Sequence, residues 1–209
     1  MQNRNNNVKY PEFFHQIPVI KLFDPLADFL GASENGLVEF SYFDVVKAAG
    51  HSCATVAGAY LMTYKALEKL FRDTSPIRGS IKIEFKNSVN EGVTGVISNV
   101  ISQITGATKE TGFKGINGKF VRHSLIDYNV SLKGLMRFTR VDTGETVELD
   151  YNPAVVPAKE KQQFLMQQII TNQANAEDKE EFKELWQERV RRIMIENFNN
   201  PDLVTFIGE

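Results

Sequence analysis

The residues of this chain best suited to chemistry are a histidine and a cysteine two positions apart. His51 precedes Cys53, the single cysteine, in the stretch AAGHSCATVAGAYLMTYKAL. In extended backbone, side chains two residues apart project to the same side, so the imidazole and the thiol can converge on one point. If Cys53 also begins a helix, the unpaired N–H groups and the helix dipole favour its thiolate. A thiolate is both a nucleophile and a soft metal ligand, and imidazole is a common ligand of zinc.

Two functional interpretations of this pair are open. In the first, which we favour at this point, His51 and Cys53 bind a divalent transition metal, zinc before others, in a metal-binding protein or in a metal-dependent enzyme that acts on a small molecule. In the second, the protein is metal-free and binds a small molecule, and Cys53 is a catalytic thiol activated by His51. The alternative without any function is a buried cysteine that packs as a small hydrophobic residue, with a histidine nearby by chance. Two residues do not complete a metal site.

Several further residues are candidate partners of the pair. His123, in KFVRHSLIDYN, lies on a predicted strand and is the preferred third metal ligand, although a half-exposed strand histidine is the commoner outcome. His15 lies among aromatic residues that favour packing, and Asp44 is better explained as a helix cap in FDVV. Arg122 precedes His123 on the same strand, so only one of the two side chains faces a pocket. Arg78, at the start of a strand, is interpreted as a surface cation.

The helices that must position the pair follow from the spacing of apolar residues. From Cys53 to Phe71, apolar residues recur every three or four positions, which predicts a long helix facing the core. FDPLADFLGA predicts a short helix with Asp24 as its N-cap and glycine at its end. GVTGVISNVISQITG predicts a second buried helix that also ends at glycine.

Alternation of apolar and polar residues predicts several strands, at Leu37–Tyr42, Arg78–Phe85, Lys119–Tyr128, Gly134–Val141 and Thr146–Tyr151. The turn DTGE joins the last two in a hairpin. Strands and helices mixed in this order, with a closing hairpin, indicate an α+β fold in which a mixed or antiparallel sheet packs against long helices, rather than a regular βαβ sheet.

The chain is predicted to have three parts. Residues 1–13 form a disordered or frayed tail, residues 14–156 form the α+β core, and residues 157–209 form a helical C-terminal extension. Two helices are expected in the extension, at Lys159–Asn172 and Asp178–Phe198. The second carries an apolar stripe, made up of Phe182, Leu185, Trp186, Val190, Ile193 and Met194. This stripe needs a surface to cover it, either the core or a second copy of the chain, and we expect a homodimer.

Composition limits the classes of function. The 209 residues are 42% hydrophobic and 24% charged, which is typical of a soluble globular protein. The formal net charge is −2, so no basic surplus favours nucleic acid or a membrane surface as a partner. No apolar run approaches the roughly 18 residues of a membrane span. The polar N-terminus does not resemble a signal peptide, so a cytoplasmic location is expected.

The stretch AGHSCATVAGAYLMTYKAL resembles the signature of the FmdE family of formylmethanofuran dehydrogenase components, in which a Gly-His-x-Cys-Pro-Gly turn opens a long helix. QITGATKETGFKGINGK is similar to the family's TG-x-T segment and the glycine-rich loop after it. The resemblance covers residues 44–128, and the matching positions are Gly50, His51, Cys53, Thr105, Gly106, Thr108, Gly118 and Lys119. It implies an α+β core, an interlocked dimer and a metal-binding or active site at the His-x-Cys pair.

The chain departs from this family at three points. Ala54 stands where the family motif often has proline, and Glu91 occupies the region where many members carry another cysteine. With one cysteine, the chain cannot form the cysteine-rich zinc domain found at the end of other members. The resemblance therefore extends to the core domain only and implies no zinc-finger contact with nucleic acid.

Overall fold

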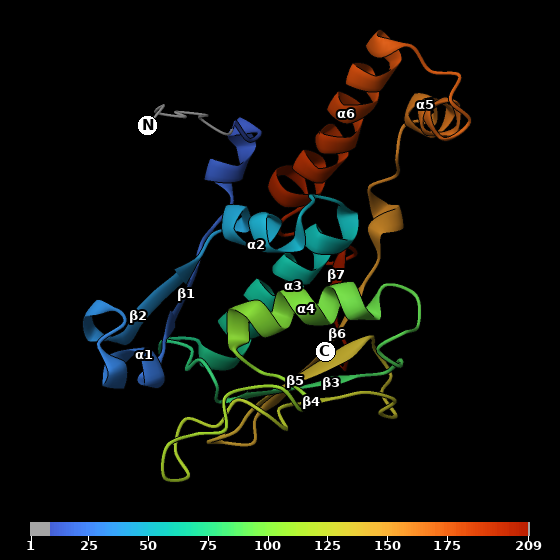
Figure 1. The fold of residues 1–209 in the computed structure, drawn as a ribbon. Helices are drawn as coiled ribbons and strands as arrows, with labels where there is room; N and C mark the ends of the chain where they lie inside the picture. Colours follow the sequence, from blue (N-terminus) through green and yellow to red (C-terminus); the bar gives the residue numbers. More distant parts are fainter. Residues whose placement is uncertain (1–8, 209) are drawn as a thin grey trace, which may run out of the picture.

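A five-stranded sheet forms one end of the molecule in the computed structural model, which describes residues 9–208 (Figure 1). Its strands are β3 (Ile81–Phe85), β4 (Ile126–Asp127), β5 (Met136–Arg140), β6 (Thr146–Tyr151) and β7 (Val204–Phe206), in the order β4-β3-β5-β6-β7. β4 is parallel to β3, and the other neighbours are antiparallel. A second, antiparallel sheet pairs β1 (Ile20–Phe23) with β2 (Leu37–Phe40). The predicted α+β class and the predicted hairpin, β5–β6, are confirmed.

The larger sheet separates apolar from charged residues by simple alternation. β3 buries every second side chain from Ile81 to Phe85. On the other face, Glu84 is opposite Arg137, which is in turn opposite Glu148. The guanidinium of Arg137 lies 3.4 Å from the Glu84 carboxylate and 3.3 Å from that of Glu148. Opposite charges on neighbouring strands therefore help to set the register of the sheet.

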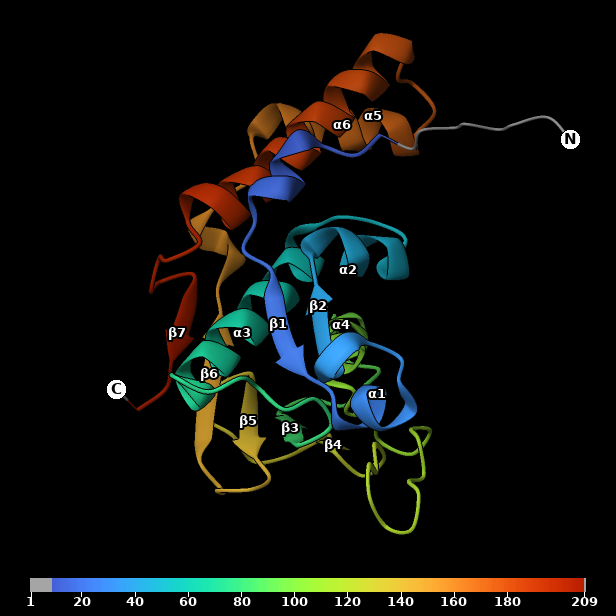
Figure 2. The same cartoon turned by 90° about the vertical axis from the view of Figure 1, so that its left-hand side faces the viewer.

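Helix α3 (Ala54–Phe71) is the centre of the fold. It packs against α4 (Thr94–Thr105), against α2 (Tyr42–Ala49) and against strands β5, β6 and β7. The hydroxyl of Tyr60, in the middle of α3, lies 2.7 and 2.8 Å from the carbonyl oxygens of Pro18 and Phe40. These contacts fix the β1–β2 ribbon to α3, and Figure 2 shows the ribbon in front of this helix. The long helix predicted from Cys53 is confirmed, as are α4 and the short helix α1 (Pro25–Leu30).

The predicted strand Lys119–Tyr128 is wrong for most of its length, because residues 107–125 form a loop. Phe120 and Ser124 have φ angles of 63° and 59°, in the left-handed region that strands do not use. The loop is held instead through the backbone of Arg122. Its N–H donates to the Phe113 carbonyl, and its carbonyl accepts hydrogen bonds from the N–H and the hydroxyl of Thr108.

The C-terminal extension is helical for most of its length but ends in the core sheet. α5 (Glu160–Ile170) and α6 (Ala176–Arg191) form a hairpin that projects from the core in both views (Figures 1 and 2). One π-helical turn, Arg192–Glu196, follows α6, and the chain then returns to the sheet as β7. Val190, Ile193 and Met194 are buried in the common core. The C-terminal part of the predicted apolar stripe is therefore covered by the core of the same chain.

The N-terminal part of the chain is packed sooner than expected. Of the tail predicted over residues 1–13, residues 1–8 lie outside the described residues. Phe13 is buried in a 3₁₀ turn, Glu12–Gln16, and Tyr10 packs edge-on against Phe43. The tail prediction is therefore wrong for this stretch. No helix in the described part of the chain is long and apolar enough to cross a membrane, and the cytoplasmic location stays a prediction.

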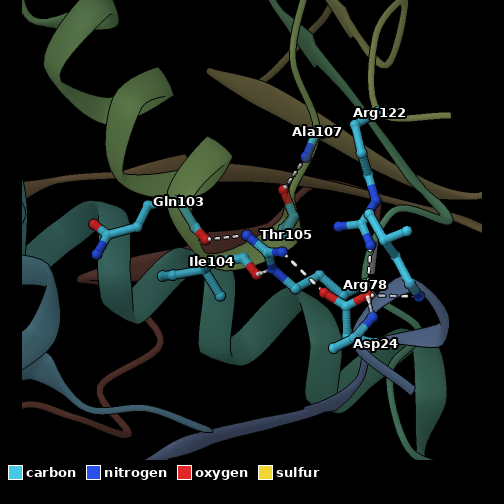
Figure 3. Close-up of polar contacts among 9 residues, drawn as sticks. Asp24, Arg78, Gln103, Ile104, Thr105, Ala107 and Arg122 are labelled. Carbon is cyan, nitrogen blue, oxygen red and sulfur yellow. Dashed lines mark hydrogen bonds and ion pairs between the residues drawn. The ribbon is translucent and has the colours of Figure 1, made fainter. Parts of the chain in front are cut away.

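A buried ion cluster joins the N-terminal ribbon to the rest of the fold (Figure 3). Asp24, the N-cap of α1, accepts a hydrogen bond of 2.9 Å from Arg78 and one of 2.6 Å from Arg122. Asp24 and Arg122 are only 4% and 5% exposed. Arg78 also donates to the carbonyls of Gln103 and Ile104, at the end of α4. The interpretation of Arg78 as a surface cation is therefore wrong.

The electrostatics of this cluster favour an ionised carboxylate. Burial alone would raise the pKa of Asp24, but the hydrogen bonds from Arg78 and from the Ala27 N–H, together with the charge of Arg122, outweigh it and lower the pKa below its ordinary value of 3.8. One carboxylate cannot neutralise both arginines. The charge of Arg78 is also partly balanced by the negative end of the α4 dipole, because Arg78 donates to the last carbonyls of this helix. Gly79 leaves room for the cluster, since a Cβ there would lie 2.5 Å from the Arg122 Nε atom.

We expect Asp24→Asn to lower the free energy of unfolding by about 3–5 kcal/mol at pH 7, because it leaves the buried guanidinium of Arg122 and the partly buried one of Arg78 without their carboxylate. Since folding lowers the pKa of Asp24, the stabilisation is present above its ordinary value of 3.8 and is lost as the pH falls through the folded value. Urea denaturation at several pH values should show that the difference in free energy of unfolding between Asp24→Asn and wild type becomes smaller below pH 4. Asp28→Asn, an exposed carboxylate in the same helix, should change stability by less than about 0.5 kcal/mol. Equal losses in the two variants would contradict the cluster's role.

Candidate functional site

The turn between α2 and α3 presents His51 and Cys53. α2 begins with a capping box, in which the Asp44 carboxylate accepts a hydrogen bond from the Ser41 N–H at 3.0 Å. Asp44 is therefore a capping residue, as the sequence favoured. α2 ends at Gly50, whose φ of 75° reverses the chain. Cys53 is the N-cap of α3, and its Sγ accepts a hydrogen bond from the Val56 N–H at 3.4 Å.

The orientation of His51 is set by the backbone. Its Nδ1 lies 3.0 Å from the carbonyl oxygen of Ala49. A carbonyl can only accept a hydrogen bond, so in this arrangement Nδ1 carries the proton. The lone pair of the neutral ring is then on Nε2, where it can accept a proton or bind a metal ion. The side chain is exposed, which leaves this nitrogen accessible.

His51 and Cys53 line one pocket of about 320 Å³, between the start of α3 and the α5–α6 hairpin. We call it the Cys53 pocket; its lining residues are His51, Cys53, Ala54, Thr55, Gln162, Trp186, Arg189 and Val190. The hairpin is attached at this point by Trp186, whose Nε1 donates to the carbonyl of Ser52 at 2.9 Å. The residue between His51 and Cys53 is therefore bound to α6, which holds the two walls of the pocket together.

Two polar side chains of the pocket have unused hydrogen-bonding groups. Gln162 is 4% exposed, and its amide oxygen Oε1 is buried without a hydrogen-bond donor among the described residues. Arg189 donates from Nε to the Val156 carbonyl at 2.8 Å and from Nη2 to the Pro153 carbonyl at 3.1 Å. No carboxylate of the described residues lies within ion-pair distance of Arg189, and no Asp or Glu lines the pocket. The pocket thus has a cation without a carboxylate partner and an amide oxygen without a hydrogen-bond donor among the described residues.

Tyr151 supports the α3 wall from behind. Its hydroxyl donates to the Ala54 carbonyl at 2.8 Å, and its ring lies against Gly58, where a Cβ would overlap it. Burial raises the pKa of Tyr151 well above its usual value, and the charge of Arg189 offsets only part of this effect. The hydroxyl is therefore a neutral hydrogen-bond donor at physiological pH, and the absence of a side chain at Gly58 lets β6 approach the start of α3.

The other predicted ligands lie outside this pocket. His123 belongs to the loop 107–125, where its Nδ1 lies 3.0 Å from the Ser124 hydroxyl. Both ribbon views place this loop away from the α2–α3 junction (Figures 1 and 2). His15 is exposed in the turn Glu12–Gln16. The structure thus brings His51 and Cys53 together but not His123, and no group of three His, Cys, Asp or Glu side chains suited to a metal ion occurs in residues 9–208.

Sequence reasoning did not find Gln162 and Arg189 as pocket residues. Trp186 was assigned only to the apolar stripe, and Arg189 is three residues further along the same helix. Gln162 is three residues before Leu165, the buried leucine of α5. The available signal was that each polar residue lies at helical spacing from an apolar residue of its own helix. This signal does not show that α5 and α6 pack at the start of α3.

No family model, curated protein or solved structure matches this chain. The resemblance to the FmdE family therefore stays a prediction.

We expect Gly58→Ala to lower the free energy of unfolding by about 1–3 kcal/mol, because the new methyl group overlaps the ring of Tyr151. In a Tyr151→Ala background the same change should cost nothing, or stabilise the chain slightly, since alanine favours a helix over glycine by about 1 kcal/mol. Urea denaturation of the two single variants and the double variant measures this coupling. An equal cost of Gly58→Ala in both backgrounds would show that the ring is not the obstacle.

Proposed function

We propose that this chain is a small-molecule-binding protein in which Cys53 is a reactive thiol and His51 is its base. The observation that carries the proposal is the convergence of His51 and Cys53 on one pocket, with the Nε2 lone pair of His51 free. The family resemblance, which also places a site at this pair, is retained as part of the proposal.

The surroundings suit this chemistry. The start of an 18-residue helix stabilises negative charge on the sulfur of its N-cap, Cys53. His51 supplies a group that takes up the thiol proton. Trp186 and Val190 provide apolar surface for a ligand, and a volume of about 320 Å³ lies in the range of small-molecule pockets.

A second candidate function is the binding of a zinc-like divalent metal ion by the same two residues. The free Nε2 of His51 and the Cys53 sulfur favour it, because both are ligands that zinc prefers. The remaining polar side chains of the pocket are Thr55, Gln162, Trp186 and Arg189, of which the last is a cation that opposes a metal ion. The pocket therefore fits zinc with two of four protein ligands. Water, a bound ligand or a second copy of the chain would supply the rest.

One set of measurements separates the two candidates. We expect the purified protein to be metal-free and its Cys53 to react with iodoacetamide faster than glutathione does. His51→Gln should lower this rate about a hundredfold, the lower end of the range for general-base catalysis. His123→Gln is the matched control and should react as wild type, because His123 lies outside the pocket. Metal analysis and thiol titration before and after a chelator are done on the same samples.

Two other outcomes would contradict the reactive thiol. Metal near one equivalent per chain that masks the thiol, is lost in His51→Gln and in Cys53→Ser, and is retained in His123→Gln would select the metal site. A metal-free protein with a slow thiol, indifferent to His51, would remove both functions.

We further propose that the chain is a homodimer that pairs through α5. Phe164 and Ile170 on this helix are 61% and 68% exposed, whereas Leu165 on its other side is buried. Light scattering at micromolar concentration should give twice the chain mass of 23.7 kDa, and Phe164→Glu should give the monomer. Phe29→Glu, an equally exposed phenylalanine on α1, should leave the dimer intact. A wild-type monomer, or dissociation by both substitutions alike, would contradict pairing through α5.

A further inference from the structure

We propose that the ligand of the Cys53 pocket is a small organic monocarboxylate with an apolar body, and that Arg189 determines this specificity. This inference rests on the proposed function, since it identifies the class of molecule that the pocket holds beside the thiol. It is carried by Arg189, which has no carboxylate partner among the described residues, and by Gln162, whose buried amide oxygen has no hydrogen-bond donor among them.

Arg189 is fixed in place without being neutralised. A guanidinium has five N–H donors, and two of those of Arg189 are used on the carbonyls of Val156 and Pro153. The carbonyls orient the plane of the group but carry no net charge. Both N–H groups of Nη1 and one of Nη2 remain, and a pair of parallel donors is the arrangement that binds a carboxylate with two hydrogen bonds.

The opposite wall of the pocket, the start of α3, adds backbone N–H donors that suit an anion. Ala54 and Thr55 are the first two residues of α3, so their backbone N–H groups have no acceptor within the helix. Val56, the third residue, already donates to the Cys53 sulfur. Neither N–H group has an acceptor among residues 9–208, both belong to residues of the pocket wall, and a helix N-terminus favours an anion.

Gln162 is the independent indication that a polar ligand belongs in the pocket. It lies on α5, not on the helix whose N-terminus forms the opposite wall, and it is 4% exposed, with its amide oxygen Oε1 buried and without a donor among the described residues. Buried amides are normally paired, because leaving one without a partner is costly. With the amide turned by 180° about its last bond, its NH₂ group takes the place of Oε1 and can donate a hydrogen bond to a carboxylate oxygen of a ligand.

The balance of charge and apolar surface favours a monocarboxylate over a phosphate. The pocket has one permanent cation, Arg189, which matches one negative charge. Trp186, Val190 and Ala54 make the rest of its wall largely apolar, and this suits a hydrocarbon or aromatic body better than the hydrated oxygens of a phosphate.

Trp186 makes the proposal directly testable, because it is the only tryptophan of the chain and lines the pocket. Its fluorescence is followed while the wild-type protein is titrated with benzoate, with benzamide as the neutral isostere, and with inorganic phosphate. We expect saturable binding of benzoate, with benzamide and phosphate each at least tenfold weaker. Benzamide as tight as benzoate, or phosphate tighter, overturns the proposal without recourse to any variant.

The role of Arg189 is tested by substitution. Arg189→Gln should weaken benzoate binding at least tenfold. Arg191→Gln removes a charge two residues away that pairs with Glu196, outside the pocket, and should not change the affinity. Because Arg189 also holds two carbonyls, Arg189→Lys serves as a second variant: it keeps the charge, loses the fork and should give an intermediate affinity. Unchanged binding in both Arg189 variants would exclude Arg189 as the determinant.

The failure of this inference and that of the proposed function have different signatures. Benzoate should slow the alkylation of Cys53 by iodoacetamide in the wild-type protein, and benzamide should not. If alkylation is fast and depends on His51, but benzoate neither protects the thiol nor changes the fluorescence, the carboxylate assignment is wrong and the reactive thiol stands. If Cys53 is slow whatever is added, the reactive thiol is wrong.

Discussion

The buried carboxylate of Asp24 is the group around which one end of the fold is assembled. It caps α1, and it binds Arg78 at the entrance to β3 and Arg122 in the loop 107–125. The Nε atom of Arg122 is buried without an acceptor in the described residues, so this guanidinium depends on Asp24 for its charge partner. Segments that share no regular secondary structure are held in place by a single ionised side chain, which is why its removal is expected to cost more than the loss of a surface ion pair.

This cluster and the Cys53 pocket are connected through the two central helices. Arg78 binds the last carbonyls of α4, and α4 packs along α3, whose first turn forms one wall of the pocket. That wall is anchored in the core, whereas the other belongs to a projecting hairpin attached by side-chain to backbone hydrogen bonds such as that of Trp186. Unpartnered polar groups occur where these two parts meet. Real proteins break local rules of polar satisfaction at functional or strained sites, and the pocket is proposed here as a site of the first kind.

The parts of the fold that the sequence predicted are those determined by neighbours in the chain. The apolar spacing from Cys53 to Phe71, the N-cap at Asp24 and the DTGE hairpin are local signals, and all three are found in the structure. The last part of the loop, residues 119–125, was mistaken for a strand because its left-handed residues, Phe120 and Ser124, are not glycines. Arg78 was misread because its partner lies 54 positions earlier, a separation that no periodicity can bridge. The strands β1 and β7 have only four and three residues, which is too short for alternation to be a clear signal.

The candidate site likewise combines residues that are neighbours in the chain with residues that only tertiary packing brings to it. His51 and Cys53 are two residues apart, and the backbone that separates them is enough to predict that they converge. Gln162, Trp186 and Arg189 come to the pocket from helices more than a hundred positions further along the chain, and only the packing of α6 against the start of α3 places them there. In the function proposed here, the adjacent pair supplies the reactivity and the distant side chains select the ligand. Chemistry of the first kind can be read from spacing in a single chain, whereas specificity of the second kind depends on tertiary contacts, so a pattern such as His-x-Cys can indicate a reaction without indicating its substrate.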